Sequence, residues 1–389
     1  MEQELSRIFS WIDGQAEAMK EVWENLVRME SPSADREAVA ALARELDTYC
    51  SAMGWGRQIC SFPKAGPTFA AWTEEGELAP VALIGHMDTV HPVHTFGDDA
   101  FRKEGDIVYG PGVYDCKGGV TAGLFAMRAL AQNGYRRRQI KLVLSGDEEV
   151  AHAYSDGEGG HQFELHCDNC AAVFNCESGA ENEEVTVERK GGAIIAVHVS
   201  GKAAHAGKEP QKGASAIRQA ASMILELESH TDFDGICYNC GRITGGKGAN
   251  IIPDSCDFTI GLRYRTNEQY EEACALIESL CANPAVPGTR CTAEQCGFYP
   301  AMEKTEKTDA LLAVYARACG MLGAPIPKGL SVGGCSDSAF VTRMGVPALC
   351  SLGVQGGGAH TPEEHASLSS IVVQCKKLAA AIYLLPDDF

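Results

Sequence analysis

The chain of 389 residues has no long uninterrupted apolar segment and no excess of positive charge. No run approaches the roughly 18 apolar residues that suggest a membrane-spanning helix. Lys and Arg number 33 against 52 Asp and Glu, which gives a formal net charge of -19. Because such a charge repels nucleic-acid phosphates and acidic lipids, we expect neither a nucleic-acid partner nor a membrane partner.

The N-terminal residues also lack the pattern of a targeting segment. They are amphipathic and acidic, with neither the basic start and apolar centre of a signal peptide nor the Arg-rich composition of a transit peptide. The chain carries 17 cysteines, an odd number that does not suit a complete set of disulfides. We therefore expect reduced thiols and a cytoplasmic protein.

What the chain does contain is an apolar fraction of 45% and a charged fraction of 22%, which are typical of a globular protein. Short apolar segments predict strands, and an apolar helix at residues 118–134 separates the second strand from the third. This order predicts an α/β fold with a mixed, mostly parallel sheet covered by helices. The predicted strands are residues 68–73, 81–85, 140–146 and 171–176.

A different pattern begins near residue 189. Three predicted strands and two amphipathic helices follow one another there, and the helix and apolar-strand pattern of the first part resumes after Pro300. We therefore expect a smaller α+β domain at residues 189–297, inserted into a discontinuous larger domain. The larger domain comprises residues 1–188 and 298–389.

Polar side chains follow several apolar segments where strands are expected to end. Parallel strands end at one edge of a sheet, where ligands collect. Two imidazoles and several carboxylates at one edge make a donor set that suits Zn²⁺. The candidates are His86 and Asp88 after residues 81–85, Asp115 before the apolar helix, Asp147, Glu148 and Glu149 after residues 140–146, Glu177 after residues 171–176, and His360 behind three glycines.

The spacing within these clusters suggests separate roles. Residues i and i+2 of an extended segment point the same way, so Asp88 can accept the second ring N–H of His86 and fix its tautomer. Glu148 and Glu149 cannot face the same direction in an extended chain, so one can ligate a metal while the other moves protons. Each cluster alone also fits an ordinary polar surface, and only their joint placement after successive strands favours a metal site.

Seven motifs, spread over nearly the whole chain, resemble those of the dizinc aminoacylase and carboxypeptidase family in order and spacing. This family includes glutamate carboxypeptidase, acetylornithine deacetylase, succinyl-diaminopimelate desuccinylase and peptidase T. The motifs are GHMDTV, GPGVYDCKGG, SGDEE, NCESG, GKAAHAGKEPQKGASAI, ANIIPD and GGGAH.

The resemblance implies two Zn²⁺ ions per chain, with Co²⁺ or Mn²⁺ as alternatives. It implies that Glu148 is the general base and acid and that Asp88 orients His86. The implied metal ligands are His86 and Glu177 for one ion, Glu149 and His360 for the other, and Asp115 as the bridge between them.

The resemblance also implies that the inserted domain is a lid and dimerisation domain. His205 would reach the active site of the partner subunit in a homodimer, and Asn250 and Arg263 would help to hold a substrate carboxylate. Members often carry an aspartate shortly before this arginine, whereas this chain has Gly261 and Leu262.

The implied activity is hydrolysis of an amide or peptide bond next to a free carboxylate. The C-terminal segment around GGCSDSAF is most similar to glutamate carboxypeptidases, which favours release of a C-terminal amino acid from a small peptide or an N-acyl amino acid. Deacetylation or desuccinylation of an amino-acid metabolite is the alternative. A catalytically inactive scaffold is disfavoured because the base and all the expected ligands are present.

Two further features fall outside these motifs. The chain contains two Cys-x-x-Cys pairs, Cys167 with Cys170 and Cys237 with Cys240. Two such pairs can form a structural zinc site, but residues 171–236 separate them, which is much longer than the usual spacing and disfavours that site. The segment after Glu149 adds three histidines, any of which could contact substrate, although we expect them to be ordinary surface residues: His152, His161 and His166.

Overall fold

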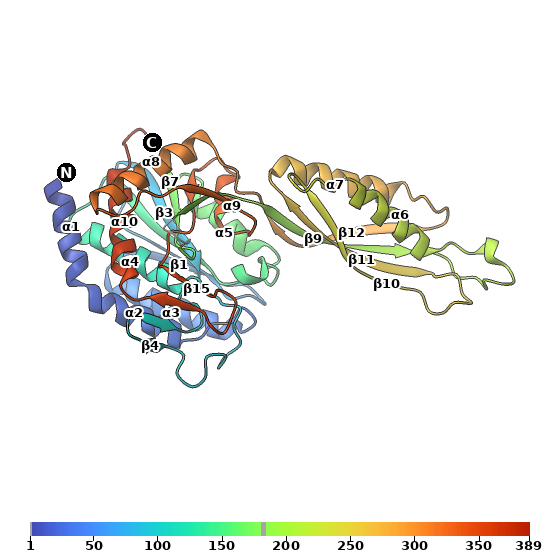
Figure 1. Cartoon of the computed structure of the whole chain (residues 1–389), viewed down its shortest axis with the longest axis horizontal. Helices are drawn as coiled ribbons and strands as arrows, with labels where there is room; N and C mark the ends of the chain where they lie inside the picture. The colour runs from blue at the N-terminus through green and yellow to red at the C-terminus, as the bar shows by residue number, and fades with distance from the viewer. Residues whose placement is uncertain (1, 180–183) are drawn as a thin grey trace. The chain divides into compact units, whose positions relative to one another are not determined.

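The computed structural model describes residues 2–179 and 184–389. The chain divides into two compact units, which are described separately (Figure 1). The larger unit comprises Met1–Glu188, Glu303–Val332 and Ser336–Phe389, and the smaller unit comprises Arg189–Met302 and Gly333–Cys335.

A six-stranded sheet forms the centre of the larger unit, in the order β1-β2-β6-β3-β7-β14. Four neighbouring strands, β6, β3, β7 and β14, run parallel to one another, and β2 and β1 continue the sheet antiparallel. The predicted mixed, mostly parallel sheet is therefore confirmed. The bounds are β1 Gly56–Cys60, β2 Thr68–Trp72, β3 Leu78–His86, β6 Arg138–Ser145, β7 Ala172–Asn175 and β14 Ala348–Leu349.

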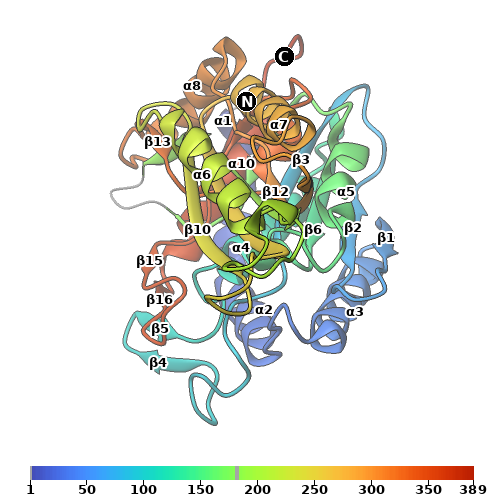
Figure 2. The same ribbon diagram turned by 90° about the vertical axis from the view of Figure 1, so that its right-hand side faces the viewer.

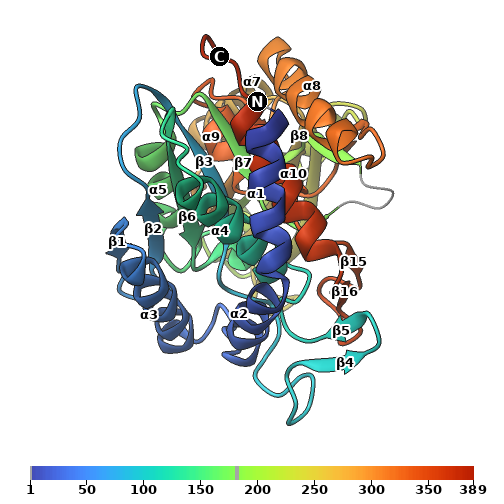
Figure 3. The same ribbon diagram turned by 90° about the vertical axis from the view of Figure 1, so that its left-hand side faces the viewer.

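Helices cover both faces of this sheet, as expected for strands that are buried on both sides. In Figure 1, α1, α4 and α10 lie to the left of the sheet and α5 and α9 to its right, and Figure 3 shows α1 in front of α4 and α10. The helices are α1 Glu2–Gly14, α2 Ala16–Arg28, α3 Arg36–Ala52, α4 Lys117–Gln132, α5 Glu158–Cys167, α8 Glu306–Met321, α9 Ser338–Thr342 and α10 Ser370–Leu384.

The core of the larger unit lies between α4 and the sheet. Leu83 and Phe174 from the strands and Phe125 from α4 are fully buried there. Shorter elements complete the unit: β4 Arg102–Glu104, β5 Ile107–Tyr109, β15 Gly356–Gly357 and β16 His365–Ser367 form one small sheet, β8 Val185–Arg189 pairs with β13 Gly329–Val332, and η1 Glu148–Val150 is a 3-10 turn.

The smaller unit is a four-stranded antiparallel sheet in the order β10-β11-β9-β12, with two helices on one face (Figure 2). Buried and more exposed residues alternate along β11, which places Phe258 and Leu262 under the helices. The elements are β9 Gly191–Ser200, η3 Pro210–Lys212, α6 Ala216–Ser229, β10 Cys237–Gly245, β11 Ser255–Tyr264, α7 Asn267–Ala282 and β12 Arg290–Tyr299.

Among the described residues, no helix is both long enough and apolar enough to cross a membrane.

Candidate metal centre

The candidate site lies in the larger unit, where β3, β6 and β7 end side by side. Parallel pairing sets His86, the last residue of β3, opposite Ser145 of β6, and Ile84 opposite Asn175 of β7. The turn η1 therefore begins three residues beyond the end of β6, and Glu177 follows β7 by two residues. This alignment explains why residues far apart in the sequence meet at one edge.

Asp115 lies between two imidazoles and presents a different oxygen to each. Its Oδ1 is 3.1 Å from His86 Nε2, and its Oδ2 is 3.5 Å from His360 Nε2. His86 Nε2 also lies 3.9 Å from Glu177 Oε1, and His360 Nε2 lies 3.0 Å from Glu149 Oε2. The five side chains thus form two adjoining groups that share Asp115.

Glu148 belongs to the first of these groups. Potential ligand atoms of His86, Glu148 and Glu177 all lie within 4.8 Å of one another, as do those of Asp115, Glu149 and His360. The adjacent glutamates therefore lie in different groups. The extended segment expected for these two residues is wrong, because they lie in the 3-10 turn η1.

The charges at this edge favour bound cations. Burial, reinforced by the negative charge of Glu177, raises the pKa of Glu148 well above its usual value, and burial also raises the pKa of Glu149. Hydrogen bonds with Asp115 and Glu149 raise the pKa of His360 to about 10. Carboxylates crowded together in this way gain stability from a positive charge between them, and imidazole nitrogens with carboxylate oxygens suit Zn²⁺, Co²⁺ or Mn²⁺. The donor set therefore fits two divalent metal ions.

Asp88 contacts His86 differently from what the spacing suggests. His86 Nδ1 lies 3.0 Å from the backbone oxygen of Asp88 and 3.6 Å from its carboxylate, so the backbone carbonyl is the acceptor that sets the tautomer. The buried carboxylate instead accepts the backbone N–H groups of Glu148 and Glu149, each at 3.2 Å, and the hydroxyl of Ser33 at 2.7 Å. Asp88 therefore holds the turn that carries both glutamates.

Glu364 is a buried residue near the site that the sequence patterns did not single out. Its carboxylate accepts the backbone N–H groups of Gly112, Tyr114 and Asp115, at 2.9 to 3.2 Å, and it contacts His91 Nε2 at 2.7 Å. It therefore fixes the loop that leads Asp115 into the site. No local pattern indicates this role, because the segment around Glu364 has the composition of an exposed turn.

His152 is buried, so the expectation that it lies on the surface is wrong. Its Nδ1 lies 2.9 Å from Asp147 Oδ1 and its Nε2 lies 2.7 Å from Asp337 Oδ1. Burial alone would lower the pKa of His152, but the charge of Asp337 and the hydrogen bonds to both carboxylates raise it to about 10. A protonated His152 thus links the residue before Glu148 to the N-cap of α9. In contrast, His161 is exposed and His166 is half-buried.

The predicted substrate-binding residues lie in the smaller unit and are exposed: His205, Asn250 and Arg263. The structure brings two of them close in the fold, because Ala206 donates its backbone N–H to Asn250 at 3.0 Å and His205 pairs with Ile251. Arg263 lies near the other end of β11, opposite Gly192, whereas the start of β11 pairs with Ser200.

The Cys-x-x-Cys pairs form no metal site among the described residues. Cys167 and Cys170 lie in the larger unit and Cys237 and Cys240 in the smaller one, and no described group of potential metal ligands includes any of the four.

Comparison with known proteins finds one matching family profile, relatives in sequence and solved structures with a similar fold. The sequence profile described as peptidase family M20/M25/M40 matches residues 82–384. Carboxypeptidase G2 of Pseudomonas sp. strain RS-16 is 27% identical over 372 residues, which cover 94% of this chain and 88% of that protein. A succinyl-diaminopimelate desuccinylase of Xylella fastidiosa is 25% identical, covering 80% of this chain and 85% of that protein. Aminopeptidase PepT from Bacillus cereus has a similar fold, with a TM-score of 0.74 and 20% identity, covering 95% of this chain and 98% of that chain.

Proposed function

Because this chain belongs to peptidase family M20/M25/M40 and is a metal-dependent hydrolase of peptides or N-acyl amino acids, we propose that it cleaves an amide or peptide bond next to a free carboxylate. Its product would be a C-terminal amino acid released from a small peptide or an N-acyl amino acid. The observation that carries the proposal is the position of Asp115 between His86 and His360, with Glu148 beside the first of these imidazoles.

We propose that five side chains hold two divalent metal ions, with Zn²⁺ as the first choice because imidazole and carboxylate are the ligands of catalytic zinc. The chemistry that two bound metal ions supply in such a site is polarisation of the scissile carbonyl group and a lowered pKa for the attacking water. The proposed ligands are His86 and Glu177, Asp115 as the bridge, and Glu149 and His360.

Glu148 is the proposed general base and acid. Burial and the nearby Glu177 raise its pKa, which makes its carboxylate a stronger base than that of an exposed glutamate. It would accept a proton from the attacking water and return that proton to the departing nitrogen. The hydrogen bond from its backbone N–H to Asp88 fixes the turn from which the side chain extends.

Two names among the relatives favour different substrates. Carboxypeptidase G2 is named for release of a C-terminal residue, and it is matched over more of this chain than the desuccinylase, so carboxypeptidase action is our first choice. An N-deacylase that acts on an amino-acid metabolite is the second.

We also propose a homodimer formed through the smaller unit, in which residues 189–297 act as a lid and dimerisation domain and His205 completes the partner's site. An edge strand supports this, since β10 pairs with β11 alone among the described strands and Ile243 on β10 is 50% exposed. Asn250 and Arg263 are the proposed contacts for the substrate carboxylate. We also propose a cytoplasmic location, where the 17 cysteines of this chain would stay reduced.

A panel of N-acyl amino acids, dipeptides, and acetylated or succinylated amines without a neighbouring carboxylate tests this proposal, with the released amine as the readout. The protein is assayed as purified, after chelation, and after Zn²⁺, Co²⁺ or Mn²⁺ is restored. We expect metal-dependent release of a C-terminal amino acid. Cleavage of only the acetylated or succinylated amines would favour the deacylase, and metal binding without any turnover would contradict catalysis.

A further inference from the structure

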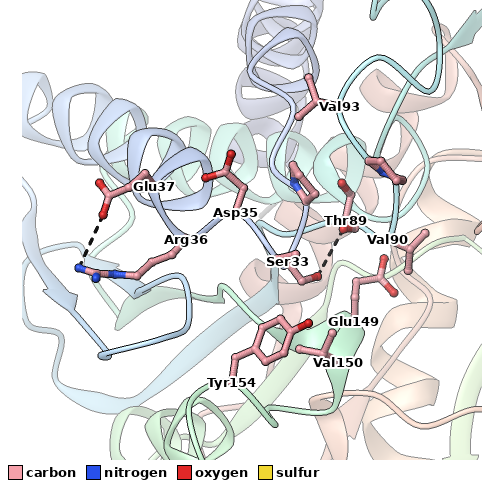
Figure 4. A pocket seen from close by; sticks show the side chains of 13 residues that line it. Ser33, Asp35, Arg36, Glu37, Thr89, Val90, Val93, Glu149, Val150 and Tyr154 are labelled. Atoms are coloured by element: carbon pink, nitrogen blue, oxygen red, sulfur yellow. Dashed lines mark hydrogen bonds and ion pairs between the residues drawn. The ribbon is translucent and has the colours of Figure 1, made fainter.

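A cavity of about 790 Å³ adjoins the candidate metal centre within the larger unit. Three segments line it: residues 32–37 at the start of α3, residues 89–93 after β3, and residues 149–154 after β6. Figure 4 shows Glu149 at one end of this cavity, with the Tyr154 ring below and Val93 above. The proposed metal ligand Glu149 is thus also a wall of the cavity.

Hydrogen bonds connect the walls of the cavity to the turn η1, which carries Glu148 and Glu149. Thr89 donates its backbone N–H to Ser31 at 2.9 Å and accepts that of Ser33 at 3.1 Å, and the hydroxyl of Ser33 donates to Asp88 at 2.7 Å. Asp88 in turn binds the backbone of Glu148 and Glu149. Because the same contacts hold the wall and the turn, the cavity is formed before any ligand binds, as ligand sites usually are.

The lining is largely apolar although it is open to solvent. Val90 is 37% exposed, Val93 is 43% exposed and Tyr154 is 37% exposed, and Pro32 and Val150 lie in the same lining. Apolar side chains that gather in one concave surface beside a reactive centre are the usual walls of a small-molecule site. The surface therefore suits an apolar group of the substrate.

The charges of the lining argue against a carboxylate in this cavity. Apart from Glu149, which is assigned to the metal, the lining contains two acidic residues, Asp35 and Glu37, and one basic residue, Arg36, which is already engaged. Its guanidinium lies 3.7 Å from Glu37 and donates to the backbone oxygen of Pro63 at 3.3 Å. A substrate carboxylate would meet net negative charge here, so this cavity does not receive the carboxylate end of the substrate.

We propose that this cavity binds the acyl side of the scissile bond and selects an uncharged acyl group of aromatic size, with Tyr154 and Val93 as specificity-determining residues. This assignment rests on the proposed function, in which the carboxylate belongs to the departing amino acid. With the carboxylate side excluded by charge, the acyl group is the part of the substrate that remains for an apolar cavity beside Glu149.

The test compares the N-benzoyl and N-acetyl forms of one amino acid, using the metal-loaded protein. The quantity measured is the ratio of their kcat/KM values in the wild type, Tyr154→Ala and Val93→Ser. We expect the wild type to prefer the benzoyl substrate and each variant to lose roughly 10-fold or more of that preference, mainly through KM. Val373→Ser is the matched control, because Val373 on α10 is 40% exposed and lies outside the cavity lining.

A second measurement does not depend on turnover. Calorimetric binding of the N-benzoyl amino acid to Glu148→Gln should weaken roughly 10-fold when Tyr154→Ala is added, and binding of the N-acetyl form should weaken much less. Equal weakening of the two ligands would overturn the assignment.

The remaining outcomes separate the cavity from the proposed function. If the panel shows no metal-dependent cleavage, both fail. If substrates are cleaved but the benzoyl to acetyl ratio is the same in the wild type and both variants, the cavity assignment alone fails. If Arg36→Met raises KM about tenfold for every carboxylated substrate and the acyl preference stays unchanged in Tyr154→Ala, the cavity binds the carboxylate and our assignment is wrong.

Discussion

The carboxylate of Asp88 accepts the backbone N–H of Glu148, with 3.2 Å between Asp88 Oδ1 and the nitrogen. Asp88 lies just beyond β3 and Glu148 just beyond β6, so this bond connects the ends of two neighbouring parallel strands. The second oxygen of Asp88 accepts the N–H of Glu149. One buried carboxylate therefore sets the position of both the proposed base and a proposed ligand, which makes Asp88 a positioning residue for the turn.

Asp88→Asn should lower kcat/KM by about 10- to 100-fold, because the amide keeps one acceptor oxygen but directs an N–H₂ group toward a backbone N–H. Steady-state kinetics and metal analysis of the purified variant measure the effect. Asp13→Asn, at an exposed carboxylate that pairs with Lys376, is the control. Unchanged kinetics in Asp88→Asn would show that the turn keeps its position without this carboxylate.

His152→Asn should reduce the free energy of unfolding by about 3 kcal/mol or more, because it leaves Asp147 and Asp337 buried without their cation. Asparagine is the suitable replacement because His152 has a backbone φ of 54°, which asparagine tolerates. Denaturant unfolding with chelator present measures the difference, and exposed His161→Asn serves as the control.

The effect of His152→Asn should depend on pH. The pKa of His152 is about 10 in the folded protein, above the value of about 6.5 expected for an unfolded chain, so the stabilisation is complete below about pH 6.5 and is lost as the pH rises toward 10. The difference between the wild type and His152→Asn should shrink over that interval. A difference that is constant from pH 6 to about pH 10 would mean that His152 is not held in its charged form.

Mixed dimers test whether His205 acts across the proposed interface. His205→Ala and Glu148→Ala should each be nearly inactive alone. In a mixed dimer, the His205→Ala chain keeps its own Glu148 and receives His205 from its partner, so one of its two sites is complete. Random assembly makes about half of the dimers mixed, and about a quarter of the wild-type activity should return. If mixed dimers form and no activity returns, His205 does not act in the partner's site.

The edge at which the site forms could be predicted from the sequence because the local pattern determines it. Apolar strands of ordinary length precede His86, Glu148 and Glu177, and parallel pairing brings their ends together. The family resemblance then linked Asp115 and His360 to these residues. The α+β fold of the smaller unit could also be predicted. Apolar and polar residues alternate along β11, and this alternation produces the observed alternation of buried and exposed side chains.

The supporting contacts could not be predicted, because they join distant segments that carry no local signal. One of the two carboxylates that hold His152 in the interior belongs to Asp337, 185 residues away along the chain. The hydrogen bond from the backbone N–H of Asp115 to Glu364 spans 249 residues. The further contacts of Asp88 could not be predicted for a related reason. The i and i+2 spacing places its carboxylate beside His86, but does not show that the carboxylate also accepts backbone N–H groups beyond β6.

The most direct test of the account is the turnover and metal content of Glu148→Ala. If Glu148 moves the proton and the other five side chains hold the metal, this variant should bind two metal ions per chain, like the wild type, and should lose about 10²- to 10⁴-fold in kcat. Turnover close to that of the wild type, with the metal retained, would contradict the assignment of Glu148 as the base and with it the proposed mechanism.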